Sequence, residues 1–181
     1  MTSPPPYRLI GLTGPNGAGK GEAAAFFAAR GYAYRSLSDI IREELEAAGL
    51  PADRDHLIAK GNAMRREGGA DVLARLLLER VTGRTVIDSI RNPAEVERFR
   101  REDGFILLAM DAPAPLRYER VFRRGRNESA STLGEFIRKE AEEMGTNPAA
   151  QQIHRCFEIA DSVVTNDGSL EQLHRRLEAF L

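Results

Sequence analysis

The sequence predicts an α/β fold: a five-stranded parallel sheet with helices on both faces, and a small helical lid. Two observations predict it. Short apolar segments of strand character alternate along the chain with segments of helical periodicity. In addition, a glycine-rich loop at residues 14–21 separates the first strand from the first helix, in the order required for a loop that cradles phosphate groups.

The five strands are predicted where apolar and β-branched residues are concentrated. They cover residues 8–13, 32–37, 85–88, 105–110 and 162–165. Residues 105–110 are almost all apolar, which predicts a central strand buried on both faces.

In the N-terminal half, the helix boundaries follow from capping and breaking residues. The helix over residues 20–30 ends at Gly31, and Ser38 is expected to cap a helix over 39–48. The pair at 68–69, two glycines, separates two further helices. We predict these over residues 53–67 and 70–81, followed by a helix over 93–101 with Pro93 in its first turn.

Four more helices are predicted in the C-terminal half. Two of them follow pairs with capping-box spacing, Thr132 with Glu135 and Ser169 with Gln172. The predicted ranges are 113–123 or 115–123, 133–144, 149–159 and 170–181.

Length and composition predict one domain over residues 8–181, after a disordered lead-in at residues 1–7. The formal net charge of -1 gives no general attraction to nucleic acid or to a membrane surface. No apolar run approaches the roughly 20 residues that span a bilayer. The single cysteine, Cys156, excludes an internal disulfide, and the three histidines lack the spacing of zinc ligands. We therefore expect a cytoplasmic monomer or homodimer whose partners are small molecules.

The glycine-rich loop has the spacing of a P-loop and is the clearest functional signal. Its backbone N–H groups are expected to surround a nucleotide polyphosphate, and Lys20 is expected to reach the terminal phosphates. A chance glycine-rich turn would not need a strand before it and a helix after it. Position 21 is glycine, whereas the common motif has a serine or threonine whose hydroxyl holds magnesium. The predicted loop residues are Gly14, Pro15, Asn16, Gly17, Ala18, Gly19, Lys20 and Gly21.

Two short motifs follow the second and third predicted strands, at the edge where open α/β sheets bind ligands. Asp39 is either a carboxylate facing a phosphoryl acceptor or a favourable acid at a helix N-terminus, and Arg42 lies one turn further along. Asp88 ends the third strand beside the P-loop strand, which suits a residue that orders magnesium directly or through water. Arg91 follows it and is expected to bind an acceptor phosphate; loop capping and a surface charge are the alternatives for Asp88 and Arg91.

An arginine cluster, followed by a polar loop, is predicted to form a lid over residues 117–144. Arginines on such a lid neutralise the charge that develops during phosphoryl transfer and exclude water. Solvated arginines are the alternative, with Glu119 paired to Arg123. The cluster consists of Arg117, Arg120, Arg123, Arg124 and Arg126.

These motifs together resemble the P-loop kinases of small molecules, of the nucleoside monophosphate kinase and dephospho-CoA kinase type, which are P-loop NTPase three-layer sandwiches. The chain is most similar to an archaeal family of dephospho-CoA-kinase-like, adenylate-kinase-like proteins and to a domain fused to some deoxycytidylate deaminases. The resemblance extends over residues 8–180 and includes the 160–170 segment around Asn166 and Gly168.

The resemblance implies a role for each site residue. The P-loop amides, Lys20 and Glu22 would hold ATP and Mg²⁺ together with Asp88, and Asn166 and Gly168 would lie near adenine. Turn chemistry is the alternative for the last two. Asp39, Arg42 and Arg91 would bind the acceptor through helices at about 39–81. Catalytic roles would fall to Lys20, Asp39, Arg91, Arg120 and Arg124.

The function predicted is ATP-dependent transfer of a phosphoryl group to a nucleoside or deoxynucleoside monophosphate. Two alternatives remain open. A dephospho-CoA kinase would use Asp39 as a base toward a ribose hydroxyl. A nucleotide-binding regulatory module or slow ATPase would explain the missing hydroxyl at Gly21.

Overall fold

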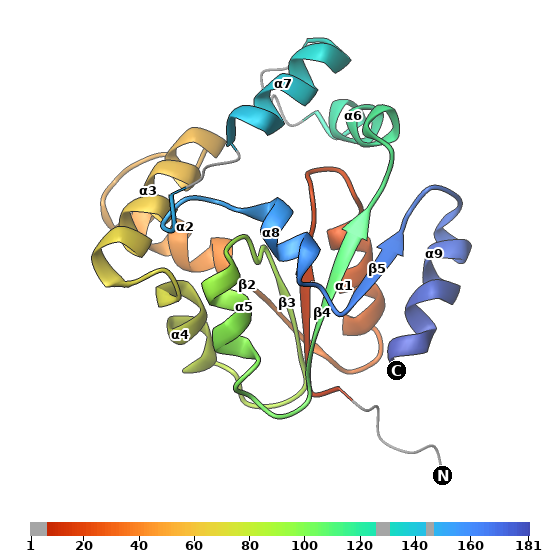
Figure 1. The fold of residues 1–181 in the computed structure, drawn as a ribbon, viewed down its shortest axis with the longest axis horizontal. Helices are drawn as coiled ribbons and strands as arrows, with labels where there is room; N and C mark the ends of the chain where they lie inside the picture. Colours follow the sequence, from red (N-terminus) through yellow and green to blue (C-terminus); the bar gives the residue numbers. More distant parts are fainter. Residues whose placement is uncertain (1–6, 126–130, 144–146) are drawn as a thin grey trace.

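The computed structural model describes residues 7–125, 131–143 and 147–181. Five parallel strands form one sheet in the order β2-β3-β1-β4-β5 (Figure 1). The predicted five-stranded α/β architecture is confirmed. The strands are β1 (Leu9–Thr13), β2 (Ala33–Ser36), β3 (Thr85–Asp88), β4 (Phe105–Asp111) and β5 (Ser162–Thr165).

Helices cover both faces of the sheet because side chains on successive strand residues point to opposite sides. Along β4, Ile106 and Leu108 pack with α1 (Lys20–Ala28) and α9 (Leu170–Leu177). Leu107 faces the other way and packs with α2 (Leu37–Ala47), α4 (Val72–Leu78), α5 (Pro93–Phe99) and α8 (Ile153–Glu158). The result is a three-layer sandwich with a core on each face.

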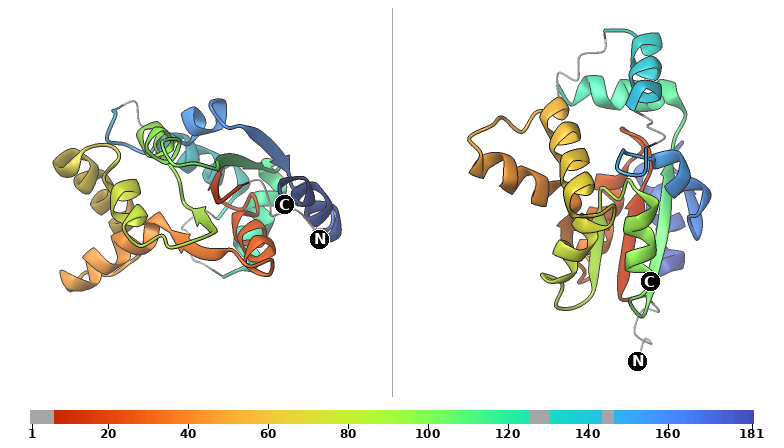
Figure 2. Two further views of the ribbon diagram at one scale, coloured as in Figure 1. Left: turned by 90° about the horizontal axis from the view of Figure 1, so that it is seen from below. Right: turned by 60° about the vertical axis from the view of Figure 1, so that its left-hand side comes forward.

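Three helices lie partly or wholly outside these layers. Figures 1 and 2 show α3 (Arg54–Gly68) beside α2 and α4, at one side of the sheet. They show α6 (Ala114–Arg123) and α7 (Leu133–Glu143) beyond the carboxyl ends of the strands, opposite the C-terminus. A 3-10 helix, Glu178–Phe180, follows α9.

Several predicted helix ends were wrong. Ser38 does not cap α2; the cap is Ser36, whose Oγ accepts a hydrogen bond from the Ser38 amide at 3.3 Å, because the strand ends there in extended conformation. The helices α4 and α8 are shorter than predicted. The Ser169–Gln172 capping box is confirmed, whereas Glu135 accepts from the Ser131 amide instead of completing a box with Thr132.

Some predictions fall outside the described residues: the lead-in at 1–6, Arg126, and the end of the lid at 144. No helix within the described residues is long and apolar enough to cross a membrane.

Candidate functional site

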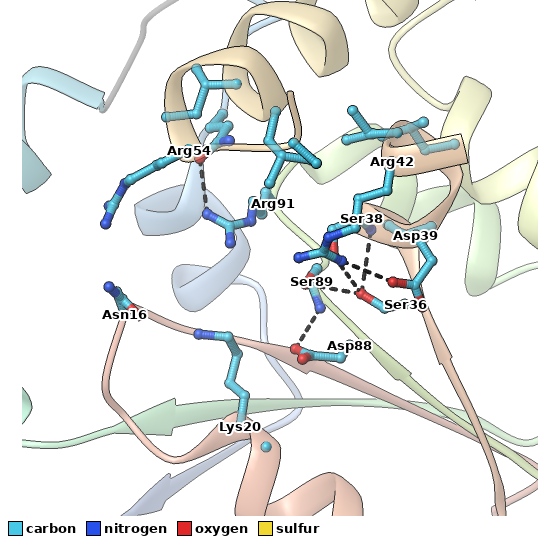
Figure 3. A pocket seen from close by; sticks show the side chains of 18 of the residues that line it. Asn16, Lys20, Ser36, Ser38, Asp39, Arg42, Arg54, Asp88, Ser89 and Arg91 are labelled. Carbon is cyan, nitrogen blue, oxygen red and sulfur yellow. Dashed lines mark hydrogen bonds and ion pairs between the residues drawn. The ribbon is translucent and has the colours of Figure 1, made fainter. Parts of the chain in front are cut away.

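A pocket of about 860 Å³ opens at the carboxyl edge of the sheet, where the P-loop and the ends of β2 and β3 meet. It brings together segments that are far apart in the sequence. Figure 3 shows Lys20 and Asp88 on one side of it and Arg42, Arg54 and Arg91 across from them. The predicted site residues that line it are Asn16, Gly17, Gly19, Lys20, Gly21, Asp39, Arg42, Asp88, Arg91 and Arg124.

The shape of the P-loop depends on glycine at close approaches to neighbouring elements. At Gly14, with φ of 128°, an added Cβ would lie 2.2 Å from the carbonyl oxygen of Met110 on β4. At Gly19, with φ of 102°, it would lie 2.1 Å from the side-chain nitrogen of Asn166. Both positions combine left-handed backbone with no room for a side chain, so the loop conformation requires glycine there.

Lys20 lies at the bottom of the pocket. Its Nζ donates hydrogen bonds to the carbonyl oxygens of Gly14, at 2.8 Å, and Pro15, at 2.9 Å. Desolvation lowers the pKa of Lys20 to about 8, although the nearby Asp88 carboxylate opposes the shift. The amine is therefore a cation near neutral pH that loses its proton in mildly alkaline solution.

Gly21 is in open space in the first turn of α1. A Cβ added there would meet nothing within 4 Å, so packing does not exclude a serine. The next residue, Glu22, is exposed and does not line the pocket. The chain therefore lacks the usual P-loop hydroxyl although the site has room for it.

Asp88 is placed beside the P-loop by the sheet itself, since β3 pairs with β1, the P-loop strand. Its Oδ1 accepts a hydrogen bond from the Ser89 amide at 2.6 Å. Ser89 is the one non-glycine residue in the described ranges with positive φ, at 67°. A positive φ is energetically unfavourable for serine, and residues in this conformation are concentrated at functional sites. The turn at Ser89 is therefore a candidate part of the site.

Asp88 offers magnesium a protein carboxylate beside the P-loop. Within the described residues no group of three or more His, Cys, Asp or Glu side chains could hold a metal ion. Mg²⁺ commonly uses one or two carboxylates together with water and substrate phosphates. The residues present fit that mode of binding.

The start of α2 carries a hydrogen-bonded group of polar side chains. Arg42 Nη1 donates to Asp39 Oδ1 at 2.8 Å and to Ser38 Oγ at 2.9 Å. The Ser36 hydroxyl, which is buried, lies 2.8 Å from Ser38 Oγ and 3.2 Å from Ser89 Oγ. The motifs after β2 and β3 are thus connected by side-chain hydrogen bonds, because β2 pairs with β3.

The loop that carries Arg91 is held by a buried ion pair. Glu95 is fully buried, and its Oε2 accepts hydrogen bonds from the amides of Arg91, at 2.9 Å, and Asn92, at 3.0 Å. Its Oε1 lies 2.7 Å from Nη2 of Arg65, which is 3% exposed. The pair connects α3 to the Arg91 loop.

Sequence reasoning missed several residues that line the pocket, among them Arg54, Arg65 and Gln151. Arg54 had a local signal, since it follows Asp53, the N-cap of α3. The other two had none, because their partners are far away in the sequence.

The arginines of α6 are divided between structural and pocket positions. Arg117 is buried and donates to the Asn16 carbonyl at 3.1 Å, and it forms an ion pair with Glu140 of α7. Arg120 donates to the carbonyls of Gly17 and Asn166, at 3.3 and 3.0 Å. Arg123 pairs with Glu119, the alternative considered for it, and Arg124 lines the pocket.

Asn166 and Gly168 do not line the pocket. The Asn166 side chain is 7% exposed and donates to the Ala18 carbonyl at 3.1 Å, so it supports the P-loop from behind. A Cβ at Gly168 would meet the Gln172 side chain at 1.8 Å. Their proximity to adenine stays a prediction.

The family comparison agrees with this geometry. A family model described as an AAA domain matches residues 10–145. A UPF0200 protein of Pyrococcus horikoshii is 35% identical over 179 residues, covering 94% of each chain. The chain belongs to the UPF0200 family. It carries the matched AAA domain over most of its length.

Solved structures show the same fold. The crystal structure of TT1252 from Thermus thermophilus aligns with a TM-score of 0.59 at 25% identity, covering 94% of each chain. Shikimate kinase from Acinetobacter baumannii, solved with shikimate, aligns with a TM-score of 0.59 at 16% identity, covering 95% of this chain and 91% of that one. The kinase-like P-loop fold expected from the sequence is confirmed; the narrower resemblance to nucleoside monophosphate and dephospho-CoA kinases stays a prediction.

Proposed function

We propose that this UPF0200 protein transfers a phosphoryl group from ATP to a small phosphorylated acceptor, a nucleoside or deoxynucleoside monophosphate. One observation carries the proposal. The P-loop and three arginines from other elements, Arg42, Arg54 and Arg91, line one continuous pocket. A polyphosphate site and a basic site that share one cavity can hold two anionic reactants next to each other.

The donor end supplies positioning and charge. P-loop amides bind the triphosphate oxygens, and Lys20 moves from its carbonyl partners to the terminal phosphates. Asp88 would hold magnesium directly or through water, and the ion would neutralise charge on those phosphates. Little other protein chemistry is needed, since phosphoryl transfer depends mainly on alignment and electrostatic stabilisation.

The acceptor end favours a phosphate over a hydroxyl group. One arginine guanidinium group can bind two phosphate oxygens at once, and a phosphate is already ionised near neutral pH. It therefore needs no strong base. Asp39, which is half exposed and accepts a hydrogen bond from Arg42 at 2.8 Å, has the role of orienting that arginine.

A second function, nucleotide binding without turnover, is favoured by Gly21. The position has room for the missing hydroxyl, so its absence is a property of this sequence and not of the packing. A regulatory module or a slow ATPase would need no fast magnesium-assisted transfer.

A product assay separates these functions. ATP and Mg²⁺ are incubated with the protein and, one at a time, with ribo- and deoxynucleoside monophosphates, dephospho-CoA and shikimate. ADP formed with a mononucleotide only, together with its diphosphate, is the expected result. ADP without any acceptor, or nucleotide binding without ADP, contradicts the proposal and supports the second function. Transfer to dephospho-CoA or shikimate contradicts the acceptor class.

Asp39→Asn tests whether the acceptor is a phosphate. We expect kcat to fall less than about tenfold, because Asp39 orients Arg42 and does not remove a proton. A general base would cost about a hundredfold or more. Asp55→Asn, on the exposed first turn of α3, is the matched control and is expected to behave as wild type. A hundredfold loss for Asp39→Asn alone would point to a hydroxyl acceptor.

A further inference from the structure

We propose that Gln151 is a positioning residue for Arg91: its neutral amide oxygen orients the guanidinium in the pocket without adding a negative charge beside it. This inference rests on the proposed function, in that the group bound by Arg91 is an anionic phosphate of the acceptor.

Gln151 contacts the functional end of Arg91 directly. It lies in the segment 147–152, between α7 and α8, and its side chain lines the pocket although the residue is only 8% exposed. Its Oε1 accepts a hydrogen bond from Arg91 Nη1 at 3.1 Å. The amide of the next residue, Gln152, donates to the Arg91 carbonyl at 2.7 Å. One segment therefore holds Arg91 at both its backbone and its side chain.

The segment is itself fixed to the start of α5. The side-chain nitrogen of Asn92, which is 2% exposed, donates to the carbonyls of Pro148, at 2.6 Å, and Ala150, at 3.0 Å. Asn147 closes a turn by accepting from the Ala149 amide at 2.9 Å. A braced backbone keeps the buried Gln151 amide at one place, which a positioning residue requires.

The chemistry of the partner distinguishes Gln151 from other side chains that orient arginines around this site. Arg42 is oriented by Asp39, Arg65 by Glu95 and Arg117 by Glu140, and all three partners are carboxylates. A carboxylate fixes a guanidinium but reduces the positive potential that it offers to an anion. An amide oxygen fixes the group without adding a charge of its own.

Gln151→Glu tests this role because it keeps the shape and adds one negative charge. Wild type and variant are saturated with β,γ-imido-ATP, so that the P-loop is occupied, and titrated with inorganic phosphate followed by ³¹P NMR. We expect phosphate binding to weaken by about tenfold or more in the variant. With a mononucleotide that serves as substrate, its KM rises similarly while the KM for ATP is unchanged.

His154→Glu is the matched control. It adds a negative charge three residues along the chain, on α8, at an exposed position that does not line the pocket. We expect phosphate binding within about twofold of wild type. Gln151→Met, which removes the acceptor without adding charge, keeps the test valid if the glutamate variant does not fold, and is expected to lose about threefold.

The outcomes separate the two proposals. Three results would overturn the role of Gln151: unchanged phosphate binding in both Gln151 variants, an equal loss in His154→Glu, or no phosphate binding by the wild-type nucleotide complex. If no acceptor is turned over but the Gln151 variants lose phosphate binding as expected, the proposed function fails and the positioning role stands. If turnover occurs and Gln151→Glu matches wild type, the proposed function stands and the positioning role of Gln151 fails.

Discussion

The two ends of the pocket are built in different ways. The P-loop end comes from one continuous segment, residues 14–21, whose shape is dictated by close contacts of its backbone with β4 and Asn166. The acceptor end comes from separate elements: α2, α3, the loop after β3 and the segment 147–152. Those elements are connected by side chains, above all Arg65, Glu95 and Gln151.

This difference determines which substitutions each end of the pocket is sensitive to. The P-loop end depends on a few glycines and one lysine, and its contacts are mostly to the backbone. The acceptor end depends on buried ion pairs and hydrogen bonds, so its geometry is coupled to the stability of the fold. The following experiments separate function from stability at the two ends.

The largest effect is expected at the P-loop end. Lys20→Ala removes the cation that we propose binds the terminal phosphates, and kcat/KM should fall by about a thousandfold while the melting temperature changes little. Lys60→Ala, on α3 and paired with Glu44, is the control and should retain activity. Steady-state assays measure kcat/KM, and thermal melts measure the melting temperature. Full activity of Lys20→Ala would refute the P-loop mechanism.

Substitutions at the acceptor end should lower the stability of the fold, whereas substitutions at the P-loop end should lower activity. Arg65→Met leaves the fully buried Glu95 without its cation, and the free energy of unfolding should fall by about 3 kcal/mol or more. Adding Glu95→Gln should recover part of the lost free energy of unfolding, since the amide oxygen still accepts hydrogen bonds from the backbone amides of the Arg91 loop. Arg80→Met, which breaks the exposed pair with Glu43, should cost less than about 1 kcal/mol in the same urea titrations. Equal losses for the two arginines would contradict this account.

A pH series sharpens the comparison at the P-loop end, because it changes the charge of Lys20. The pKa of Lys20 in the free protein is lowered to about 8, so the amine is charged below that pH and neutral above it. ATP affinity should therefore fall as pH rises above about 8, and binding near pH 8 should take up a proton. Calorimetry in two buffers with different ionisation enthalpies measures the uptake. Lys20→Arg should abolish it, and persistent uptake in that variant would assign the proton to another group.

The smallest effect is expected at Gly21. Gly21→Ser adds a hydroxyl beside the proposed magnesium site, and kcat/KM should rise by about two- to fivefold with a steeper dependence on Mg²⁺. Gly21→Ala adds the same Cβ without the oxygen and is the matched control. Identical kinetics of the two variants would show that the hydroxyl has no function here.

Sequence patterns predicted the fold well because its signals are local. Strand hydrophobicity, the P-loop spacing and the Ser169–Gln172 capping box each occupy a few consecutive residues. The motifs at Asp39 and Asp88 were predictable for the same reason, since parallel strands place their carboxyl ends at one edge of the sheet.

Long-range pairing was not predictable from those patterns. Arg65 and Glu95 are 30 residues apart, and Arg91 and Gln151 are 60 apart. In the sequence, Arg65, Glu95 and Gln151 look like ordinary surface residues. The error at Ser38 has a local cause: two serines, at 36 and 38, compete as caps, and the strand end decides in favour of Ser36. Tertiary contacts determine these choices, and periodicity contains no information on them.

The open space around Gly21 has an evolutionary consequence. Glycine and serine codons such as GGC and AGC differ by a single base, and no neighbouring atom lies within 4 Å to oppose the new side chain. Exchange of glycine for serine at position 21 is therefore one mutational step that the packing around the Cβ does not oppose. Gly14 and Gly19 have no such freedom, since an added Cβ at either position would overlap a neighbouring atom.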